Sequence, residues 1–99
     1  MANSPKIHIR TDGMIHDNDC RKRAKKGGDT IEWMADGGGG PWTIQFTPTN
    51  LLTTATVAVP AGGSGTGTVD TTKPLGKYLY HVLNGAGTPV DDPDIILET

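Results

Sequence analysis

Glycine and proline interrupt this chain so often that short strands are favoured over helices. Glycine supplies 14 of the 99 residues and proline another 7, and both destabilise the interior of a helix. Threonine, whose branched side chain favours extended backbone, supplies 14 more. We therefore expect an all-β chain of short strands joined by turns.

The length and the small number of apolar residues limit the chain to one lean domain, residues 1–99. A chain of 99 residues is too short for two independent cores. Isoleucine, leucine, valine and phenylalanine make up only 19 residues, but the net charge of −2 is too small for a disordered chain. The lone cysteine, Cys20, excludes an internal disulfide, so packing alone must hold the fold.

The apolar segments also bear on the location of the protein. No apolar run approaches the ~20 residues that a membrane-spanning helix needs. The segment Met1–Pro5 lacks the apolar stretch of a signal peptide. We therefore expect a soluble, cytoplasmic protein with no membrane partner.

Segments in which apolar and polar residues alternate predict the strands. The clearest is Trp42–Thr47, where Trp42, Ile44 and Phe46 share one face. Turns rich in glycine or proline recur about every 8–12 residues, which is typical of two-sheet sandwiches. We expect seven or eight strands and no helix, with Met14–His16 as a weak further candidate. The expected strands are Lys6–Arg10, Arg21–Lys25, Thr30–Met34, Trp42–Thr47, Ala55–Val59, Gly65–Asp70, Lys77–Leu83 and Asp94–Glu98.

Three of these segments, in order, resemble motifs of the cupredoxin family of small copper sandwiches. Gly28–Trp33 is similar to the family's Gly-Asp-x-Val-x-Trp/Phe strand, and Pro41–Phe46 to its Pro-His-x-Val-x-Phe strand. Gly76–Val82 is similar to Gly-x-Tyr-x-Tyr/Phe-x-Cys, and Ile95–Leu97 stands where the last strand would be. The resemblance spans about residues 28–97 and implies a cupredoxin-like Greek-key β-sandwich. An immunoglobulin- or fibronectin-like sandwich is the alternative.

The resemblance also implies which side chains form the core. One face of each motif strand would pack between the two sheets, with Tyr78 buried and Leu79 pointing outward. The expected core residues are Ile31, Trp33, Ile44, Phe46, Tyr78, Tyr80, Val82 and Ile96.

The residues that would bind copper in this family are missing. A copper site of this kind needs two imidazoles and a thiolate, usually with a weak axial thioether. Trp42 stands at the motif position of the first histidine and Val82 at that of the cysteine, while Leu83–Pro93 contains neither histidine nor methionine. Cys20 lies in a different segment and cannot replace the thiolate. We therefore expect no copper site, no other cofactor and no electron transfer of the family's kind.

A metal site outside the family position is a second hypothesis. It would recruit ligands from His8, His16, Cys20 and His81, together with carboxylates. His16 and Cys20 share a face only on a helix, and Asp17–Asp19 between them favours a turn. We therefore expect these histidines to be ordinary surface or core residues.

The outward face of the strand that ends at Leu83 carries an apolar stripe. Leu79 and Leu83 flank His81 there, on a strand that should be central. This stripe could be covered in two ways. Either the Thr49–Thr54 loop folds over it with its apolar pair Leu51–Leu52, or a protein partner or second copy binds to it. We favour the loop, and with it a monomer over a homodimer, because the apolar pair has no other evident role. If the loop covers the stripe, Leu79→Asp should unfold the protein.

The basic and glycine-rich segments have ordinary explanations. Arg21–Lys26 lacks the interleaved aromatic residues that stack on bases, and lysine and arginine protect edge strands from aggregation. We therefore expect no nucleic-acid partner. Gly37–Pro41 and Ala61–Gly65 lead into strands rather than helices, so they are turns and not phosphate-binding loops.

No residue pattern indicates catalysis. Neither Ser4 nor Ser64 lies in a nucleophile motif. Asp91 and Asp92 are adjacent, so in a strand they would point to opposite faces, and Pro93 favours a loop there. We therefore expect the protein not to be an enzyme.

The leading functional hypothesis is a non-catalytic binding or assembly module with a protein as its partner. Loops on a rigid sandwich are where such domains usually recognise partners. The alternative is a metal-handling protein that binds Cu or Zn through histidines outside the family's copper site. The candidate binding residues are Trp42, Leu79, His81, Leu83, Asp91 and Asp92.

Overall fold

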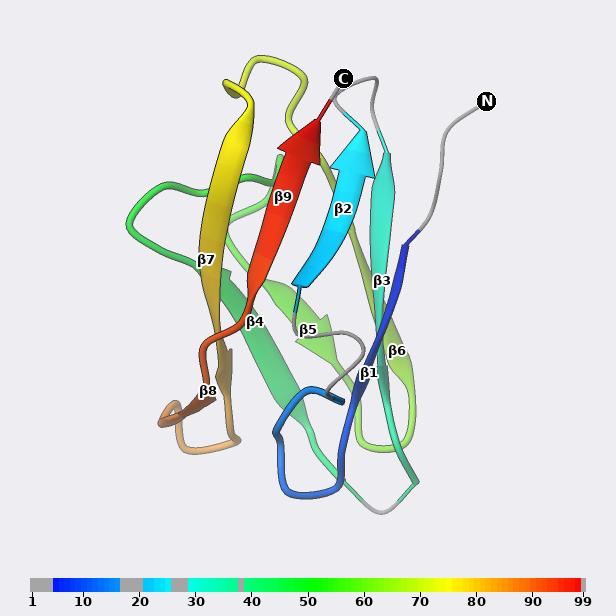
Figure 1. Ribbon diagram of the computed structural model, residues 1–99. Helices are drawn as coiled ribbons and strands as arrows, with labels where there is room; N and C mark the ends of the chain where they lie inside the picture. The colour runs from blue at the N-terminus through cyan, green and yellow to red at the C-terminus, as the bar shows by residue number, and fades with distance from the viewer. Residues whose placement is uncertain (1–4, 17–20, 26–28, 38, 99) are drawn as a thin grey trace.

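A computed structural model of the chain describes residues 5–16, 21–25, 29–37 and 39–98. These residues form nine strands in two sheets. No helix in this part of the chain is long and apolar enough to cross a membrane. The strands, labelled in Figure 1, are β1 (Lys6–Ile9), β2 (Arg21–Lys25), β3 (Thr30–Ala35), β4 (Trp42–Phe46), β5 (Val57–Val59), β6 (Ser64–Thr68), β7 (Gly76–Leu83), β8 (Pro89–Asp91) and β9 (Asp94–Glu98).

The smaller sheet has the order β1-β3-β6. β1 runs parallel to β3, and β6 runs antiparallel to it. Successive side chains of a strand point to opposite faces, and burial alternates accordingly along β1 and β3. Ile7, Ile9, Ile31 and Trp33 are fully buried on the inner face, which forms one wall of the core.

β6 carries glycine at the positions where the other strands carry apolar side chains. A Cβ on Gly65 would overlap the carbonyl oxygen of Ala58 in β5, and a Cβ on Gly67 would lie 2.6 Å from Cδ1 of Leu52. Glycine therefore allows β5 and the segment around Leu52 to approach β6 closely.

The larger sheet has the order β2-β9-β7-β4-β5, and β8 pairs with β7 outside this path. β2, which holds most of the basic run, is an edge strand, as expected. The central strand β7 has different neighbours along its two halves (Figure 1): Gly76–Leu79 pairs with β9, and Tyr80–Leu83 pairs with β4, both antiparallel.

An aromatic cluster fills the centre of the core. Trp33 from the smaller sheet meets Tyr80 and Phe46 from the larger one, with ring centroids 5.6 and 6.2 Å away. Both contacts are edge-to-face, a favourable geometry for aromatic rings. The expected burial of Tyr78 and exposure of Leu79 are confirmed, at 7% and 44% exposed. Seven of the expected core residues are buried: Ile31, Trp33, Ile44, Phe46, Tyr78, Tyr80 and Val82.

The expectation was wrong for Ile96. Ile95 and Leu97 occupy the core, whereas Ile96 is only half-buried. The register explains this, because Ile95 lies opposite the buried Tyr78 and Ile96 lies opposite the exposed Lys77. Three consecutive apolar residues show no alternation, so the sequence does not indicate which of them face inward.

Two short segments also differ from expectation. Met14–His16 is not a strand, because Ile15 forms only an isolated bridge with Ile9. Conversely, β8 lies in a segment that was expected to be a loop, and it pairs with the end of β7 through a shift in register. Proline at its first residue is tolerated because β8 lies at an edge. The other expected strands are confirmed, with some ends shifted by a few residues.

Leu51 and Leu52 do not cover the outer face of β7. Both side chains are buried in the core, and Leu52 forms a bridge with Val69, next to β6. Leu52 fills the space that the missing side chain of Gly67 leaves open. The expectation that this loop covers the outer stripe was therefore wrong, and Leu79 stays exposed.

Leu79→Asp is expected to leave the isolated protein folded. Leu79 makes no part of the core, but it lies opposite Asp94 in β9. The free energy of unfolding should therefore fall by about 1 kcal/mol or less, mainly because two carboxylates would face each other. Urea unfolding followed by circular dichroism measures this change. The matched control is Val82→Asp, which places a carboxylate in the core and should abolish cooperative unfolding. Unfolding of the Leu79 variant would mean that its side chain is covered in the free protein.

Candidate functional site

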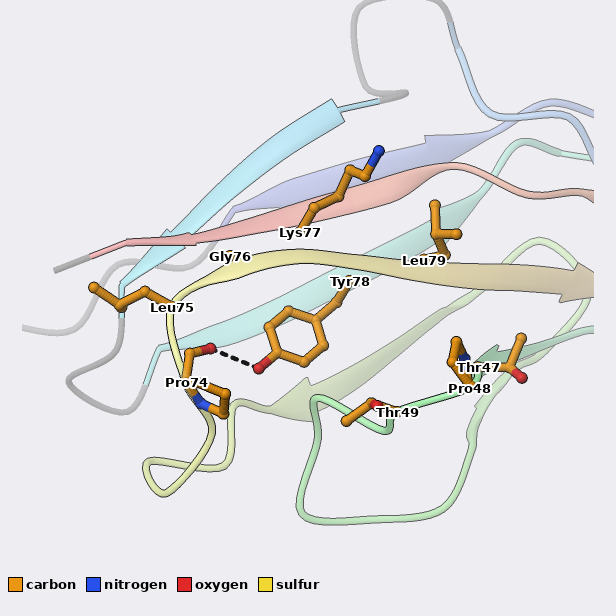
Figure 2. Close-up of a pocket in the computed structure, with 9 residues that line it drawn as sticks. All are labelled: Thr47, Pro48, Thr49, Pro74, Leu75, Gly76, Lys77, Tyr78 and Leu79. Carbon is orange, nitrogen blue, oxygen red and sulfur yellow. Dashed lines mark hydrogen bonds between the residues drawn. The ribbon is translucent and has the colours of Figure 1, made fainter.

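The candidate binding site is a groove beside the first half of β7, shown in Figure 2. It has a volume of about 380 Å³ and lies between Thr47–Thr49, which follow β4, and Pro74–Leu79. Figure 2 shows Lys77 and Leu79 on one side of β7 and the ring of Tyr78 on the other.

The groove exists because β4 ends before β7 does. The last bond between them is donated by Thr47 N–H to the carbonyl oxygen of Leu79, at 3.1 Å. Pro48 follows, and the chain leaves the sheet. Gly76–Tyr78 therefore has β9 on one side and the groove on the other. The groove occupies the place that a longer β4 would fill.

Apolar side chains are exposed along this groove. Among the described residues, the large apolar side chains that stay exposed are Leu75 at 49%, Met14 at 45% and Leu79 at 44%. Leu75 and Leu79 line the groove, and Lys77 between them is the charged residue of the lining. A groove that exposes one leucine of β7 and one from the bend before it has the composition of an interaction site.

Tyr78 closes the inner side of the groove. Its hydroxyl donates a hydrogen bond to the carbonyl oxygen of Pro74 at 2.5 Å. Burial raises the pKa of Tyr78 above its ordinary value of 10.0. The phenol therefore stays protonated at neutral pH, and it fixes the turn before β7 rather than supplying a charge.

The candidate residues from the sequence are divided between different places. Leu79 lines the groove, whereas His81, Asp91 and Asp92 line a second cavity of about 390 Å³ near Met14. Leu83, which is half-buried, lines neither cavity.

The walls of the groove, Thr47–Thr49 and Pro74–Gly76, were not predicted from the sequence. The signal for them was a difference in length. The alternation around β4 stops at Pro48, and β4 pairs only with Tyr80–Leu83 of the longer β7.

In the second cavity, Asp91 is already used for structure. Its Oδ2 accepts a hydrogen bond from Ile15 N–H at 2.9 Å, and its Oδ1 accepts one from Asp92 N–H at 3.0 Å. The first bond ties the turn before Ile15 to β8, across 76 positions of sequence. The carboxylate of Asp91 therefore serves to anchor a turn. His81, which lines the same cavity, has a buried Nδ1 without a hydrogen-bond partner among the described residues.

Asp91→Ala is expected to destabilise the protein by about 1 kcal/mol, because it removes the hydrogen bond between its carboxylate and the part-buried Ile15 N–H. Asp92→Ala is the matched control, since this neighbouring carboxylate is exposed, and its change should stay within about 0.5 kcal/mol. Urea unfolding of both variants measures the difference. Equal stability of the two variants would show that the bond to Ile15 contributes nothing.

The position at which the resemblance places copper does not fit a metal. Val82 and Trp42 are both buried, and neither side chain offers a lone pair to a metal ion. A Cβ on Gly13 would lie 2.8 Å from Cζ3 of Trp42 and 2.6 Å from Cγ2 of Val90. The Gly13 turn therefore packs closely against the indole, with Val90 beside this turn, and the side chain of Trp42 is buried.

Two histidines of the metal hypothesis lie together. The ring centroids of His8 and His16 are 5.8 Å apart, and His16 Nε2 lies 2.8 Å from Oδ2 of Asp36. His81 lies in the other sheet, and Cys20 lies outside the described residues. Within the part of the chain that the structure describes, no group of three or more His, Cys, Asp or Glu side chains is arranged to hold a metal ion.

No protein-family model and no curated protein sequence matches the chain. Solved structures do match it. A proline-to-glycine variant of amicyanin in the reduced Cu(I) form at pH 4 gives a TM-score of 0.66 at 16% identity, over 99% of this chain and 85% of that chain. An oxidized methionine-to-lysine variant of amicyanin gives 0.64 at 19% identity, over 99% of this chain and 86% of that one.

A variant of the McoA multicopper oxidase from the hyperthermophile Aquifex aeolicus matches with a TM-score of 0.53 at 14% identity, over 99% of this chain and 30% of that chain. Identities this low show a shared fold and not a shared chemistry. The expected cupredoxin-like architecture is confirmed and is favoured over the immunoglobulin-like alternative. This chain has the cupredoxin-like fold.

Proposed function

We propose that the protein is a non-catalytic protein-binding module that recognises its partner with the groove beside β7. The observation that carries the proposal is the exposure of Leu75 and Leu79 along a groove of about 380 Å³. The domain has few large apolar residues, and most of them are buried. While Leu75 and Leu79 are exposed to solvent, they contribute little hydrophobic stabilisation, and a partner that buries them would gain it on binding.

Copper electron transfer has less support. The positions of the family's first histidine and of its cysteine hold Trp42 and Val82, which are packed in the core. A valine side chain has no atom that can donate a lone pair to copper, so no movement of the backbone would supply the missing ligand. The fold is therefore proposed to serve here as a rigid support for the groove.

A capture experiment with matched variants tests the proposal. Wild-type protein, Leu79→Asp and Met14→Asp are immobilised and exposed to an extract of the native cell, and the retained proteins are identified by mass spectrometry. Met14 is as exposed as Leu79 but lies outside the groove. We expect a set of proteins retained by wild type and Met14→Asp and lost with Leu79→Asp. Identical sets from all three would contradict the use of this groove.

A metal-handling protein is the second candidate function. It is favoured by the distance of 5.8 Å between the rings of His8 and His16, since a pair of imidazoles binds Cu or Zn. It ranks second because the described residues offer no third ligand in a suitable arrangement. A titration with metal ions separates the two candidates.

A further inference from the structure

The main chain of Lys77, which lines the groove, points to the side of β7 that β4 no longer covers, as the hydrogen bonds of its neighbours show. In an antiparallel sheet, the N–H and C=O of one residue point to the same neighbouring strand, and those of the next residue point to the opposite one. Tyr80 N–H donates to Pro93 O at 3.1 Å, on the β9 side, whereas Leu79 O accepts from Thr47 N–H on the β4 side. Lys77, two residues before Leu79, therefore also points to the β4 side, where β4 has already ended.

An unpaired donor and acceptor on one strand residue are the requirements for adding an extended peptide to the edge. The neighbours of β7 (β4, β8 and β9) all run antiparallel to it, so an added segment that continues the path of β4 is antiparallel as well. In such a pair, the residue directly opposite Lys77 exchanges both hydrogen bonds with it. Thr47 already occupies the place opposite Leu79, which sets where the added segment begins.

The charges and apolar groups along the groove determine which side chains such a segment needs. Lys77 has no ion-pair partner in the described chain, so an acidic residue directly opposite it is favoured. Leu75 lies in the bend just before β7 and is exposed at the same end of the groove, so an apolar side chain is favoured two residues further along the segment. Leu79 lies diagonally across from the acidic residue of the added segment, close enough to contact the side chains of that segment.

We propose that the groove binds an extended segment of a partner protein with the pattern acidic-x-apolar, added as a short antiparallel strand along Gly76–Tyr78 with its acidic residue opposite Lys77. This inference rests on the proposed function and specifies its ligand. The main chain of Lys77 supplies the binding bonds, and the Lys77 ammonium group and Leu75 supply the selectivity.

The first test uses amide exchange and a synthetic peptide. In the free protein, the amide of Lys77 should exchange with solvent faster than that of Tyr80, which is bonded to Pro93. The probe is acetyl-Thr-Asp-Thr-Val-Thr-amide at millimolar concentration, followed by ¹⁵N NMR. We expect the Lys77 amide to shift and its exchange to slow. A Lys77 amide that is already protected in the free protein, or that is unaffected by the peptide, would overturn the proposal.

Matched peptides test the pairing itself. N-methylation of the aspartate removes the N–H that faces Lys77 and should weaken binding about tenfold or more. N-methylation of the threonine after it alters an N–H that points away from β7, and it should weaken binding much less. Equal losses would contradict the assigned register.

A charge exchange tests the selectivity. Replacing the peptide aspartate by lysine should weaken binding to the wild-type protein about two- to fivefold, and Lys77→Glu should reverse this order. The same preference in both proteins would overturn the role of Lys77. If sedimentation instead shows a wild-type dimer that Leu79→Asp dissociates, a second copy occupies the groove and the peptide proposal is wrong.

The two proposals fail separately. If protein capture depends on Leu79 but the acidic peptide does not bind at Lys77, the protein is a binding module and the proposal of strand addition is wrong. The absence of capture that depends on Leu79 rejects the use of the groove, and strand addition with it.

Discussion

Trp33→Ala is expected to remove most of the stability of the domain. Trp33 is fully buried and meets Phe46 and Tyr80, so it contacts both sheets of the sandwich. Truncating a buried tryptophan to alanine costs about 3–5 kcal/mol, and small domains have about 5–15 kcal/mol in total. Urea unfolding followed by circular dichroism should therefore show a midpoint at a much lower urea concentration, or no folded baseline.

Trp33→Phe is the matched control. The indole Nε1 of Trp33 has no hydrogen-bond partner among the described residues. Phenylalanine therefore loses only packing, and the loss should be clearly smaller than that of alanine. A Trp33→Ala variant as stable as the wild type would show that the two sheets do not pack through this ring.

Gly65→Ala is expected to have the second large effect. The added Cβ would overlap the carbonyl oxygen of Ala58 and lie 2.9 Å from Cγ1 of Val57. Ala58 is held by its pairing with Thr43 in β4, so β5 cannot move away without losing that pairing. We expect a loss of about 3 kcal/mol or more, because a clash with main-chain atoms is not relieved by rotation of a side chain.

Gly85→Ala separates this clash from the general effect of replacing glycine. A Cβ on Gly85 meets nothing within 4 Å, and Gly85 is not among the glycines with positive φ. Its stability should stay within about 0.5 kcal/mol of the wild type. Equal effects of the two substitutions would show that β5 does not approach β6 as closely as the structure has it.

The strands that alternate cleanly were predictable from the sequence. In β4, Trp42, Ile44 and Phe46 are separated by polar residues, so the inward face is unambiguous. The same holds for Tyr78, Tyr80 and Val82 in β7. Burial of one face is the dominant constraint on such strands, and the core assignments from these strands are confirmed.

Other parts of the fold depend on contacts between distant segments and were not predictable. Ile95 and Ile96 are chemically identical, and only the pairing of Ile95 with Tyr78 decides which of them faces the core. Leu52 is drawn away from Leu79 because Gly67, far along the chain, leaves a space for it. Neither the inward direction of Ile95 nor the burial of Leu52 beside Gly67 can be predicted from the local pattern of the sequence.

The candidate site was predictable only in part, for the same reason. The outward direction of Leu79 followed from alternation, but the groove depends on the point at which β4 leaves β7. That point is set by the bond from Thr47 to Leu79 and by the course of the chain after Pro48. The side of β7 to which the main chain of Lys77 points depends on which residues bond to β9 and which to β4, and side-chain patterns do not reveal this.

A titration with Cu(II), Cu(I) and Zn(II), followed by calorimetry and by absorption spectroscopy, tests most directly whether this cupredoxin-like sandwich lacks a metal site of high affinity. With Trp42 and Val82 packed at the copper position, we expect no sub-micromolar binding and no intense blue absorption. Sub-micromolar binding that disappears when His8 and His16 are both replaced by alanine would contradict this expectation and establish the metal-handling function instead.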